Sequence, residues 1–386
     1  MPETHPLVAA TALAPRLRAA AGETERQRRL APDLVRALAV GGVFRMCVPR
    51  ALGGGEVDPA TMVRTIETLA QADGAAGWSA MIGATSGVTS AYLPDDAARE
   101  IYGSDPETVS GGAFAPLGKA TVVGGGYRVT GRWPFASGCE HCAWLMGGSI
   151  VLDGGKPRLL PSGTPDNRLM LLPASEVRIL DTWDVAGLRG TGSHDIAIED
   201  RFVPATRSVS LITDRPRATG PLYAFPVFGL LALGIASVAL GIARRAIDEL
   251  VGLAGGKTPQ GSRRVLAERP VVQTQVAEAE ATLSAARAFL FETVGAAWER
   301  ARAAGTIEVR ERAQLRLAAT HATLASARAV DLMYAAGGGT AVYATSPLQR
   351  CFRDVHVATQ HTLIAPATLE LTGRILLGLE AETSML

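Results

Sequence analysis

The stretch "GLRGTGSHDIAIEDRFVP", residues 187–204, decides how the chain is organised. Its first half is rich in glycine and small polar residues, and its second half alternates apolar and polar residues as a half-buried β-strand does. The glycine-rich turn therefore precedes a strand, whereas a dinucleotide- or phosphate-binding loop of this composition opens a helix. We interpret residues 187–193 as a turn and not as a nucleotide-binding fingerprint.

Upstream of this turn, the stretch "KATVVGGGYRVTGRWPFASG", residues 119–138, predicts a β-hairpin around Gly124–Gly126. Two apolar runs that follow it, "WLMGGSIVL" and "RLMLLP", are typical of buried strands. Together with the strand after residue 193, these segments predict a compact β-barrel-like or sandwich-like domain over residues 109–213, a size that is common for domains.

Both flanks of this β region have helical periodicity. In the N-terminal flank, Asp58 followed by Pro59 is typical of a helix start. In the C-terminal flank, Gly337–Gly339 resembles a helix C-cap, and four periodic stretches predict a four-helix bundle: 227–253, 266–303, 307–336 and 346–382. We therefore expect an α+β fold made of an N-terminal helical domain, a central β domain and a C-terminal bundle that also mediates oligomerisation: 1–108, 109–213 and 214–386.

The charge balance and one long apolar segment indicate whether nucleic acid or a membrane is a partner. With 38 Lys+Arg against 37 Asp+Glu, the chain lacks the charge excess of a nucleic-acid or polybasic membrane binder. Residues 222–243 carry no charge and are long enough to span a bilayer, but Pro226 and several glycines lower their apolar density. Because a helix that is apolar all round is buried in protein or in lipid, we expect a buried core helix at the centre of an oligomer, with no membrane partner.

The four cysteines are few and irregularly spaced, which argues against a disulfide framework. Arg16 and Arg18 also interrupt the first Ala-rich stretch before it reaches the length of a signal-peptide core, so we expect a cytoplasmic protein. The segment Cys139–Cys142, "CEHC", could supply three zinc ligands or a redox pair. No second ligand pair and no βαβ context accompany it, so we expect no metal site.

Nucleophilic catalysis has no sequence support. No G-x-S-x-G elbow is present, which disfavours a hydrolase. His356 and His361 are five residues apart, so on one helix they would not share a face, and at most one of them should point into any given site.

The two stretches above and a third, "SPLQRCFRDVHVATQH" at residues 346–361, resemble the acyl-CoA dehydrogenase superfamily over essentially the whole chain. More narrowly, they are similar to its oxygen-using branch, the two-component flavin-dependent monooxygenases. That resemblance implies reduced FMN, or reduced FAD, supplied by a separate flavin reductase, because the chain has no nicotinamide-binding fingerprint. It also implies O2 as co-substrate, a homotetramer, and oxygenation of a small aromatic or amine substrate through a C4a-hydroperoxyflavin.

The resemblance also assigns the flavin-binding residues. Phe135 would pack on the isoalloxazine ring, and the hydroxyl of Ser137 would reach flavin N5 or O4 and take part in catalysis. A flat ring independently favours an aromatic wall with a few placed polar groups. Trp78 would line the substrate cavity and Trp183 the cofactor cavity, although both could equally be ordinary core residues.

Cations are needed for the flavin phosphate. Arg263 and Arg264 lie where the family places a phosphate-binding arginine, often across a subunit interface. Arg353 is another candidate, although the Arg353–Asp354 pair could equally be an internal ion pair.

The choice between two reactions depends on residues after Arg353–Asp354. Dehydrogenases of this superfamily commonly carry a catalytic glutamate there, but no carboxylate lies within residues 355–369. Thr362 falls at the glutamate position, where it would contact substrate, and His361 lies beside it. An imidazole suits oxygenation, so His361 is the catalytic candidate. Oxidation of an acyl thioester remains the alternative, and a flavin-binding or structural relic is the third reading.

Overall fold

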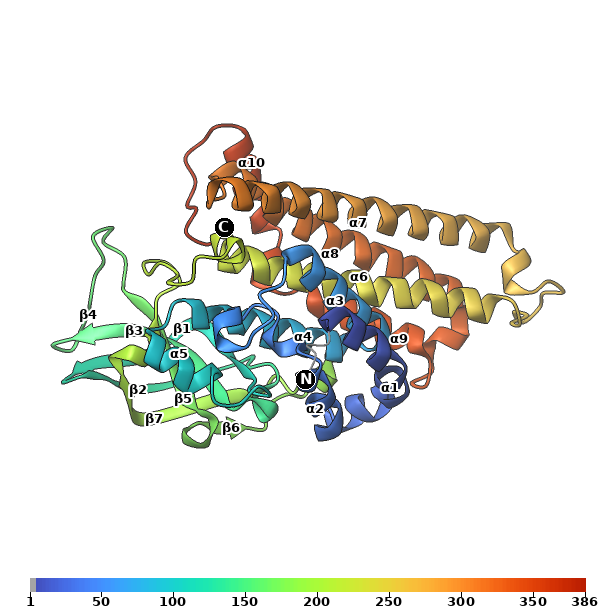
Figure 1. Ribbon diagram of the computed structural model, residues 1–386. Coiled ribbons are helices and arrows are strands. Elements are labelled where there is room, and N and C mark those ends of the chain that lie inside the picture. Colours follow the sequence, from blue (N-terminus) through green and yellow to red (C-terminus); the bar gives the residue numbers. More distant parts are fainter. Residues whose placement is uncertain (1–4) are drawn as a thin grey trace.

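The computed structural model describes residues 5–386, so the first four residues of the predicted N-terminal domain lie outside the described residues. A β-sheet forms one end of the molecule, and a long helical bundle extends from it (Figure 1). The chain passes from helices to the sheet and back to helices, which confirms the predicted α+β class. The α-helices are α1 Pro6–Gln27, α2 Pro32–Val40, α3 Pro59–Ala72, α4 Gly74–Ser86, α5 Asp95–Tyr102, α6 Val227–Ala254, α7 Pro270–Ala304, α8 Val309–Gly337, α9 Pro347–Ala358 and α10 Ala367–Leu376.

Local capping explains where α3 and α4 begin. The carboxylate of Asp58 accepts a hydrogen bond from the Thr61 amide, and Pro59 is the first helical residue, as predicted. Asp73 then ends α3 in an extended conformation and caps α4 by accepting from the Ala76 amide over 3.1 Å. The chain bends at Asp73, and this bend brings Trp78 on α4 against the sheet end of the bundle.

The sheet has eight strands in the order β6-β7-β2-β1-β3-β5-β8, with β4 paired to β3. β1 and β2 form the predicted hairpin, with Val123 opposite Gly126, whereas β1 and β3 run parallel. Trp133, at the end of β2, is fully buried and donates to the Gly148 carbonyl over 2.6 Å, which anchors the turn that follows it. The strands are β1 Ser110–Val123, β2 Gly126–Trp133, β3 Trp144–Asp153, β4 Lys156–Pro157, β5 Asn167–Pro173, β6 Arg178–Leu180, β7 Asp195–Pro204 and β8 Ser208–Val209.

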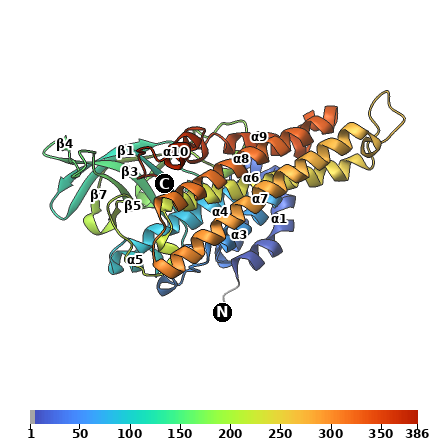
Figure 2. The same cartoon turned by 90° about the horizontal axis from the view of Figure 1, so that it is seen from above.

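The apolar helix α6 is the core of the bundle. By length and composition it could cross a membrane, but 89% of its most apolar window is buried inside the protein, as in the predicted core helix. It packs against α3, α4, α8 and α9 of the same chain, and the view from above shows it enclosed by these helices (Figure 2). Because one chain already buries it, the composition of α6 gives no reason to expect an oligomer, contrary to the sequence argument.

The fourth periodic stretch, predicted over 346–382, is not one helix. It comprises α9, a short 3-10 helix Thr362–Ile364 and α10. Pro366 has no amide hydrogen and disfavours a helical conformation in Ala365, which is extended and separates the 3-10 helix from α10. His361 therefore lies outside α9, at the start of the 3-10 helix, and its direction is set by that turn and not by the face of a long helix.

Candidate functional site

Two turns that are distant in sequence meet at the end of the sheet. The Ala136 amide donates to the His194 carbonyl over 3.0 Å, and the Gly138 amide donates to the Thr191 carbonyl over 2.8 Å. These bonds exist because β2 and β7 are paired, so the turn after β2 lies against the turn before β7. Phe135 and Leu188 have φ values of 63° and 49°, the left-handed region that is costly for residues other than glycine. Such strain concentrates at functional sites.

A buried cluster of hydroxyl groups lies between the two turns. The indole Nε1 of Trp78 donates to Ser137 Oγ over 3.0 Å. Ser137 Oγ lies 2.7 Å from Ser193 Oγ, which lies 2.6 Å from Thr191 Oγ1. The Thr191 hydroxyl also donates to the Leu188 carbonyl over 2.8 Å. The structure thus brings together Trp78 and Ser137, two of the predicted site residues, and adds Ser193 and Thr191 behind them.

His361 lies beside this cluster, with its ring 6.0 Å from that of Trp78. Its Nδ1 accepts a hydrogen bond from the Leu363 amide over 3.2 Å, which caps the 3-10 helix. Burial, and then the charge of Arg316, lower the pKa of His361 to about 4, so the ring is neutral near pH 7. A neutral ring whose Nδ1 accepts carries its proton on Nε2. His361 therefore presents an N–H donor, and the adjacent Thr362 is exposed.

His356 has a different environment. Its Nε2 lies 2.8 Å from Asp331 Oδ1 on α8, and its ring packs against Phe352 with 4.6 Å between centroids. Of these two histidines, His361 is the one whose ring lies against Trp78 of the hydroxyl cluster.

An aromatic wall borders the same turns. Phe135 is 68% exposed and meets Trp183 edge-on, with ring centroids 6.0 Å apart, whereas Trp183 is buried. Trp183 is held by its Nε1–H donating to the Leu188 carbonyl and by its amide donating to His194 Nδ1, over 3.2 Å each. An exposed aromatic ring on a strained backbone next to buried hydroxyls fits a flat, partly polar ligand such as an isoalloxazine.

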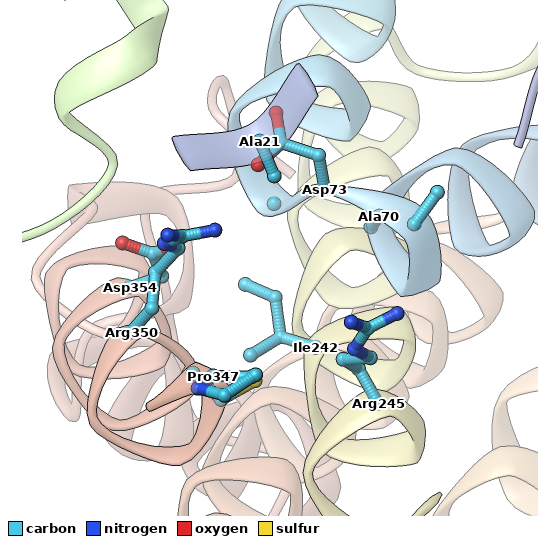
Figure 3. Close-up of a pocket in the computed structure, with 11 residues that line it drawn as sticks. Ala21, Ala70, Asp73, Ile242, Arg245, Pro347, Arg350 and Asp354 are labelled. Atoms are coloured by element: carbon cyan, nitrogen blue, oxygen red, sulfur yellow. The ribbon is translucent and has the colours of Figure 1, made fainter. Parts of the chain in front are cut away.

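A charged cluster supports the 187–193 turn from the helical side. Asp354 on α9 accepts from the Leu188 amide over 2.6 Å, and burial raises the pKa of its carboxyl to about 7. Burial likewise raises the pKa of Asp73 to about 6. Both carboxyl groups line a cavity of about 30 Å³, and Figure 3 shows Arg350 beside Asp354 with Arg245 across the cavity. This volume suits a water molecule and not an organic substrate.

The arginines predicted to hold the flavin phosphate do not meet the hydroxyl cluster within this chain. Arg353 binds Glu25 on α1, with Nη2 2.5 Å from Oε1, and also donates to the Ala186 carbonyl and to Gln349. Arg353 thus forms an internal ion pair, but with Glu25 and not with the Asp354 that the sequence suggested, and its role toward the flavin phosphate stays a prediction. Arg263 and Arg264 are exposed in the loop between α6 and α7, at the end of the bundle away from the sheet (Figures 1 and 2).

The Cys139–Cys142 segment forms a 3-10 turn after Ser137. Cys139 Sγ donates to the Gly192 carbonyl over 3.6 Å, and Cys142 Sγ donates to the Gly138 carbonyl over 3.3 Å. Burial raises the pKa of the Cys139 thiol to about 12 and also raises that of Cys142. His141 packs on Phe44 with 5.7 Å between ring centroids. Within residues 5–386, no group of three or more His, Cys, Asp or Glu side chains is arranged to hold a metal ion.

Sequence reasoning missed Arg316 on α8. Its side chain is 3% exposed, its Nη2 donates to the Met385 carbonyl over 2.6 Å, and its Nε has no partner in the part of the chain that the structure describes. Burial alone lowers its pKa to about 10, and no carboxylate of residues 5–386 pairs with it. The signal was present in the sequence, because Arg316 interrupts the apolar stripe formed by Ala313, Leu315 and Ala319.

Comparisons with known proteins identify the family of this chain. The family models described as "Acyl-CoA dehydrogenase, N-terminal domain" and "Acyl-CoA dehydrogenase, C-terminal domain" match residues 8–100 and 233–366. Indole-3-acetate monooxygenase of Pseudomonas putida is 39% identical, over 94% of this chain and 90% of that protein. The flavin-dependent monooxygenase oxygenase subunit HsaA of Rhodococcus jostii is 31% identical, over 92% of this chain and 93% of its own length.

A solved structure, XiaF of Streptomyces sp. in complex with FADH2 and glycerol, matches with a TM-score of 0.89 and 26% identity, over 97% of this chain and 95% of XiaF. The fold is thus that of the acyl-CoA dehydrogenases. The chain belongs to the flavin-dependent monooxygenase branch of the acyl-CoA dehydrogenase superfamily. It is the oxygenase component of a two-component enzyme that uses reduced flavin and O2, so oxidation of an acyl thioester is no longer the competing function.

Proposed function

We propose that this oxygenase acts on a planar aromatic substrate that carries a carboxylate, and that His361 and Ser137 form its reacting site. Arg316 carries the substrate proposal. A guanidinium that is 3% exposed without an anionic partner among residues 5–386 is costly to bury, and a bound carboxylate would offset this cost. Its charge, after burial, also contributes to the lowered pKa of His361.

The similarity to indole-3-acetate monooxygenase supports the same substrate class, because indole-3-acetate is an aromatic ring with a carboxylate. Within the site, the bound reduced flavin supplies the electrons that activate O2. Ser137 holds the flavin edge, and Phe135 and Trp183 border its ring. His361, with its Nε2–H, donates a hydrogen bond to an oxygen atom in the site, while Trp78 excludes water.

The substrate proposal is tested by comparing indole-3-acetate with 3-methylindole, which has the same ring and no carboxylate. In the intact enzyme, kcat/KM should favour the acid by about 10²-fold, since a charge-assisted pair in a site closed to water is worth about 1.5–3 kcal/mol. In Arg316→Met the preference should disappear, whereas Arg316→Lys should retain part of it. Arg316 also binds the Met385 carbonyl, so its replacement could lower activity on both substrates. The informative quantity is therefore the ratio of the two kcat/KM values within each variant. Equal ratios in the wild type and Arg316→Met would contradict the proposal.

We also propose a homotetramer. Several large apolar side chains are exposed near the C-terminal end of the chain, including Tyr343 at 69% and Leu377 at 77%. The loop between α6 and α7, which carries Arg263 and Arg264, lies at the end of the bundle away from the sheet (Figure 1), so these arginines would serve a neighbouring subunit's flavin. Light scattering at micromolar concentration tests the assembly, and a monomer would overturn it.

The four free, buried thiols support a reducing, cytoplasmic setting.

A further inference from the structure

The hydroxyl groups behind Ser137 form a chain whose hydrogen-bond direction is determined. Its members are Trp78, Ser137, Ser193 and Thr191, joined by contacts of 3.0, 2.7 and 2.6 Å. All four side chains are buried, and the three hydroxyl-bearing residues are 2–4% exposed. Each hydroxyl has a single proton to donate, and an indole N–H can only donate. These constraints allow the direction of every bond to be assigned from one end of the chain.

Thr191 forms one end of this chain of hydroxyl groups. Its hydroxyl donates to the Leu188 carbonyl over 2.8 Å, so its one proton is used there. The 2.6 Å contact between Thr191 and Ser193 therefore requires Ser193 to donate. The proton of Ser193 is then used as well, and the 2.7 Å contact requires Ser137 to donate to Ser193.

At the other end, Trp78 donates to Ser137 Oγ, which occupies one lone pair of that oxygen. Ser137 is left with one free lone pair and no free proton. It can accept a hydrogen bond from a ligand, and it cannot donate one. The sequence predicted that this hydroxyl reaches flavin N5 or O4, and the structure restricts the contact to a ligand atom that bears a proton.

We propose that Thr191 and Ser193 are positioning residues that fix Ser137 as an acceptor, and thereby make the site select reduced over oxidised flavin. The inference rests on the proposed placement of flavin N5 at Ser137. Reduced flavin bears an N5–H, which donates to Ser137. Oxidised flavin has only a lone pair at N5, which faces another lone pair and is left without a partner. An oxygenase that receives reduced flavin from a separate protein gains from this selection, because the oxidised form competes poorly for the site.

The test measures two dissociation constants, one for oxidised flavin and one for reduced flavin under anaerobic conditions, using FMN and FAD. In Ser193→Ala the proton of Ser137 becomes free and can be donated to oxidised N5. The ratio of the oxidised to the reduced dissociation constant should then fall by about tenfold, which lowers the midpoint potential of the bound flavin by about 30 mV for a two-electron couple. Thr191→Ser keeps the hydroxyl and should keep the wild-type ratio. Thr191→Val frees the proton of Ser193 and should lower the ratio less than Ser193→Ala does.

The matched variant Ser137→Ala tests the placement of flavin N5 separately from the direction of the hydrogen bonds. If Ser137→Ala changes the ratio and Ser193→Ala does not, the directional chain is wrong while the flavin placement stands. If Ser137→Ala leaves both dissociation constants unchanged, flavin N5 does not lie at Ser137, and the placement fails together with the inference. Should Ser193→Ala not fold, a wild-type ratio in Thr191→Val would overturn the directional chain.

Discussion

Two buried polar clusters involve the 187–193 turn, and they differ in charge. On one side are the neutral hydroxyls of Ser137, Ser193 and Thr191, which form short bonds with one another. On the other side, the carboxylate of Asp354 accepts from the Leu188 amide, near Asp73 and Arg350. A neutral hydroxyl keeps its hydrogen-bond direction as pH changes, whereas a buried carboxyl changes charge. We infer that the hydroxyl cluster contacts the ligand, whereas the charged cluster holds the 187–193 turn in place.

The largest effect is expected at His361, beside the hydroxyl cluster. His361→Asn keeps an acceptor near the position of Nδ1 for the Leu363 amide but loses the Nε2–H donor. His361→Gln places an amide N–H near the position of Nε2. Because a positioned acid or base contributes about 10²–10⁴-fold, we expect His361→Asn to lower product formation by at least about 10²-fold, and His361→Gln to lower it less.

The measurement is product and hydrogen peroxide together, since turnover lost from oxygenation should appear as peroxide. His356→Ala is the matched control and should have little effect, because His356 pairs with Asp331 away from the cluster. A harmless His361→Asn with a damaging His361→Gln would show that Nδ1, and not Nε2, carries the function. Because the pKa of His361 is about 4, kcat/KM should show no ionisation of this residue near pH 6.5.

A smaller effect is expected for Ser137→Ala. The change removes the contact with the flavin edge and leaves the indole N–H of Trp78 without its acceptor. A lost hydrogen bond is worth about 1 kcal/mol, and more when a buried partner is left unpaired. The ratio of hydrogen peroxide to oxygenated product should therefore rise by about tenfold. An unchanged ratio of peroxide to product would mean that Ser137 only shapes the turn.

The charged cluster should affect stability and its pH dependence. The folded pKa of Asp354, about 7, lies above the ordinary 3.8. Between these values the folded chain holds a proton that the unfolded chain has lost, so this group lowers the free energy of unfolding as pH rises from about 4 to 7. Asp354→Asn lacks this titration. Its stability relative to the wild type should therefore rise with pH across that window, by an amount on the order of a few kcal/mol.

Urea unfolding at pH 4.5 and pH 7.5 measures this difference. Asp96→Asn, at an exposed carboxyl, is the matched control and should leave the pH dependence unchanged. If Asp354→Asn is destabilised equally at both pH values, the carboxyl is ionised in the folded protein throughout, and the contrast between the two clusters is wrong.

The smallest effect is expected at the cysteines. Both thiols donate to nearby carbonyls, and a serine hydroxyl can do the same. Cys139→Ser combined with Cys142→Ser should retain flavin binding and lose no metal, with a stability cost of about 1–2 kcal/mol for two buried substitutions. Stoichiometric zinc in the purified wild type would overturn this interpretation.

The sequence by itself determined the α+β class, the hairpin around Gly124–Gly126, the helix start at Asp58–Pro59 and the buried apolar helix α6. These features depend on periodicity and on turn and capping residues, which act over a few positions. The resemblance of three short motifs to a flavoprotein family was also visible there, and the comparisons confirm it.

Only the tertiary structure decided how the site is assembled. Trp78 and Ser193 are 115 positions apart, and a bend at Asp73 and the pairing of β2 with β7 bring both to Ser137. The turn between α9 and the 3-10 helix sets the direction of His361, and apolar neighbours on α8 bury Arg316 without a carboxylate partner among residues 5–386. Hydrogen-bond direction and buried charge depend on which groups meet in space. Local patterns record neither, because a donor and its acceptor can be separated by more than a hundred residues.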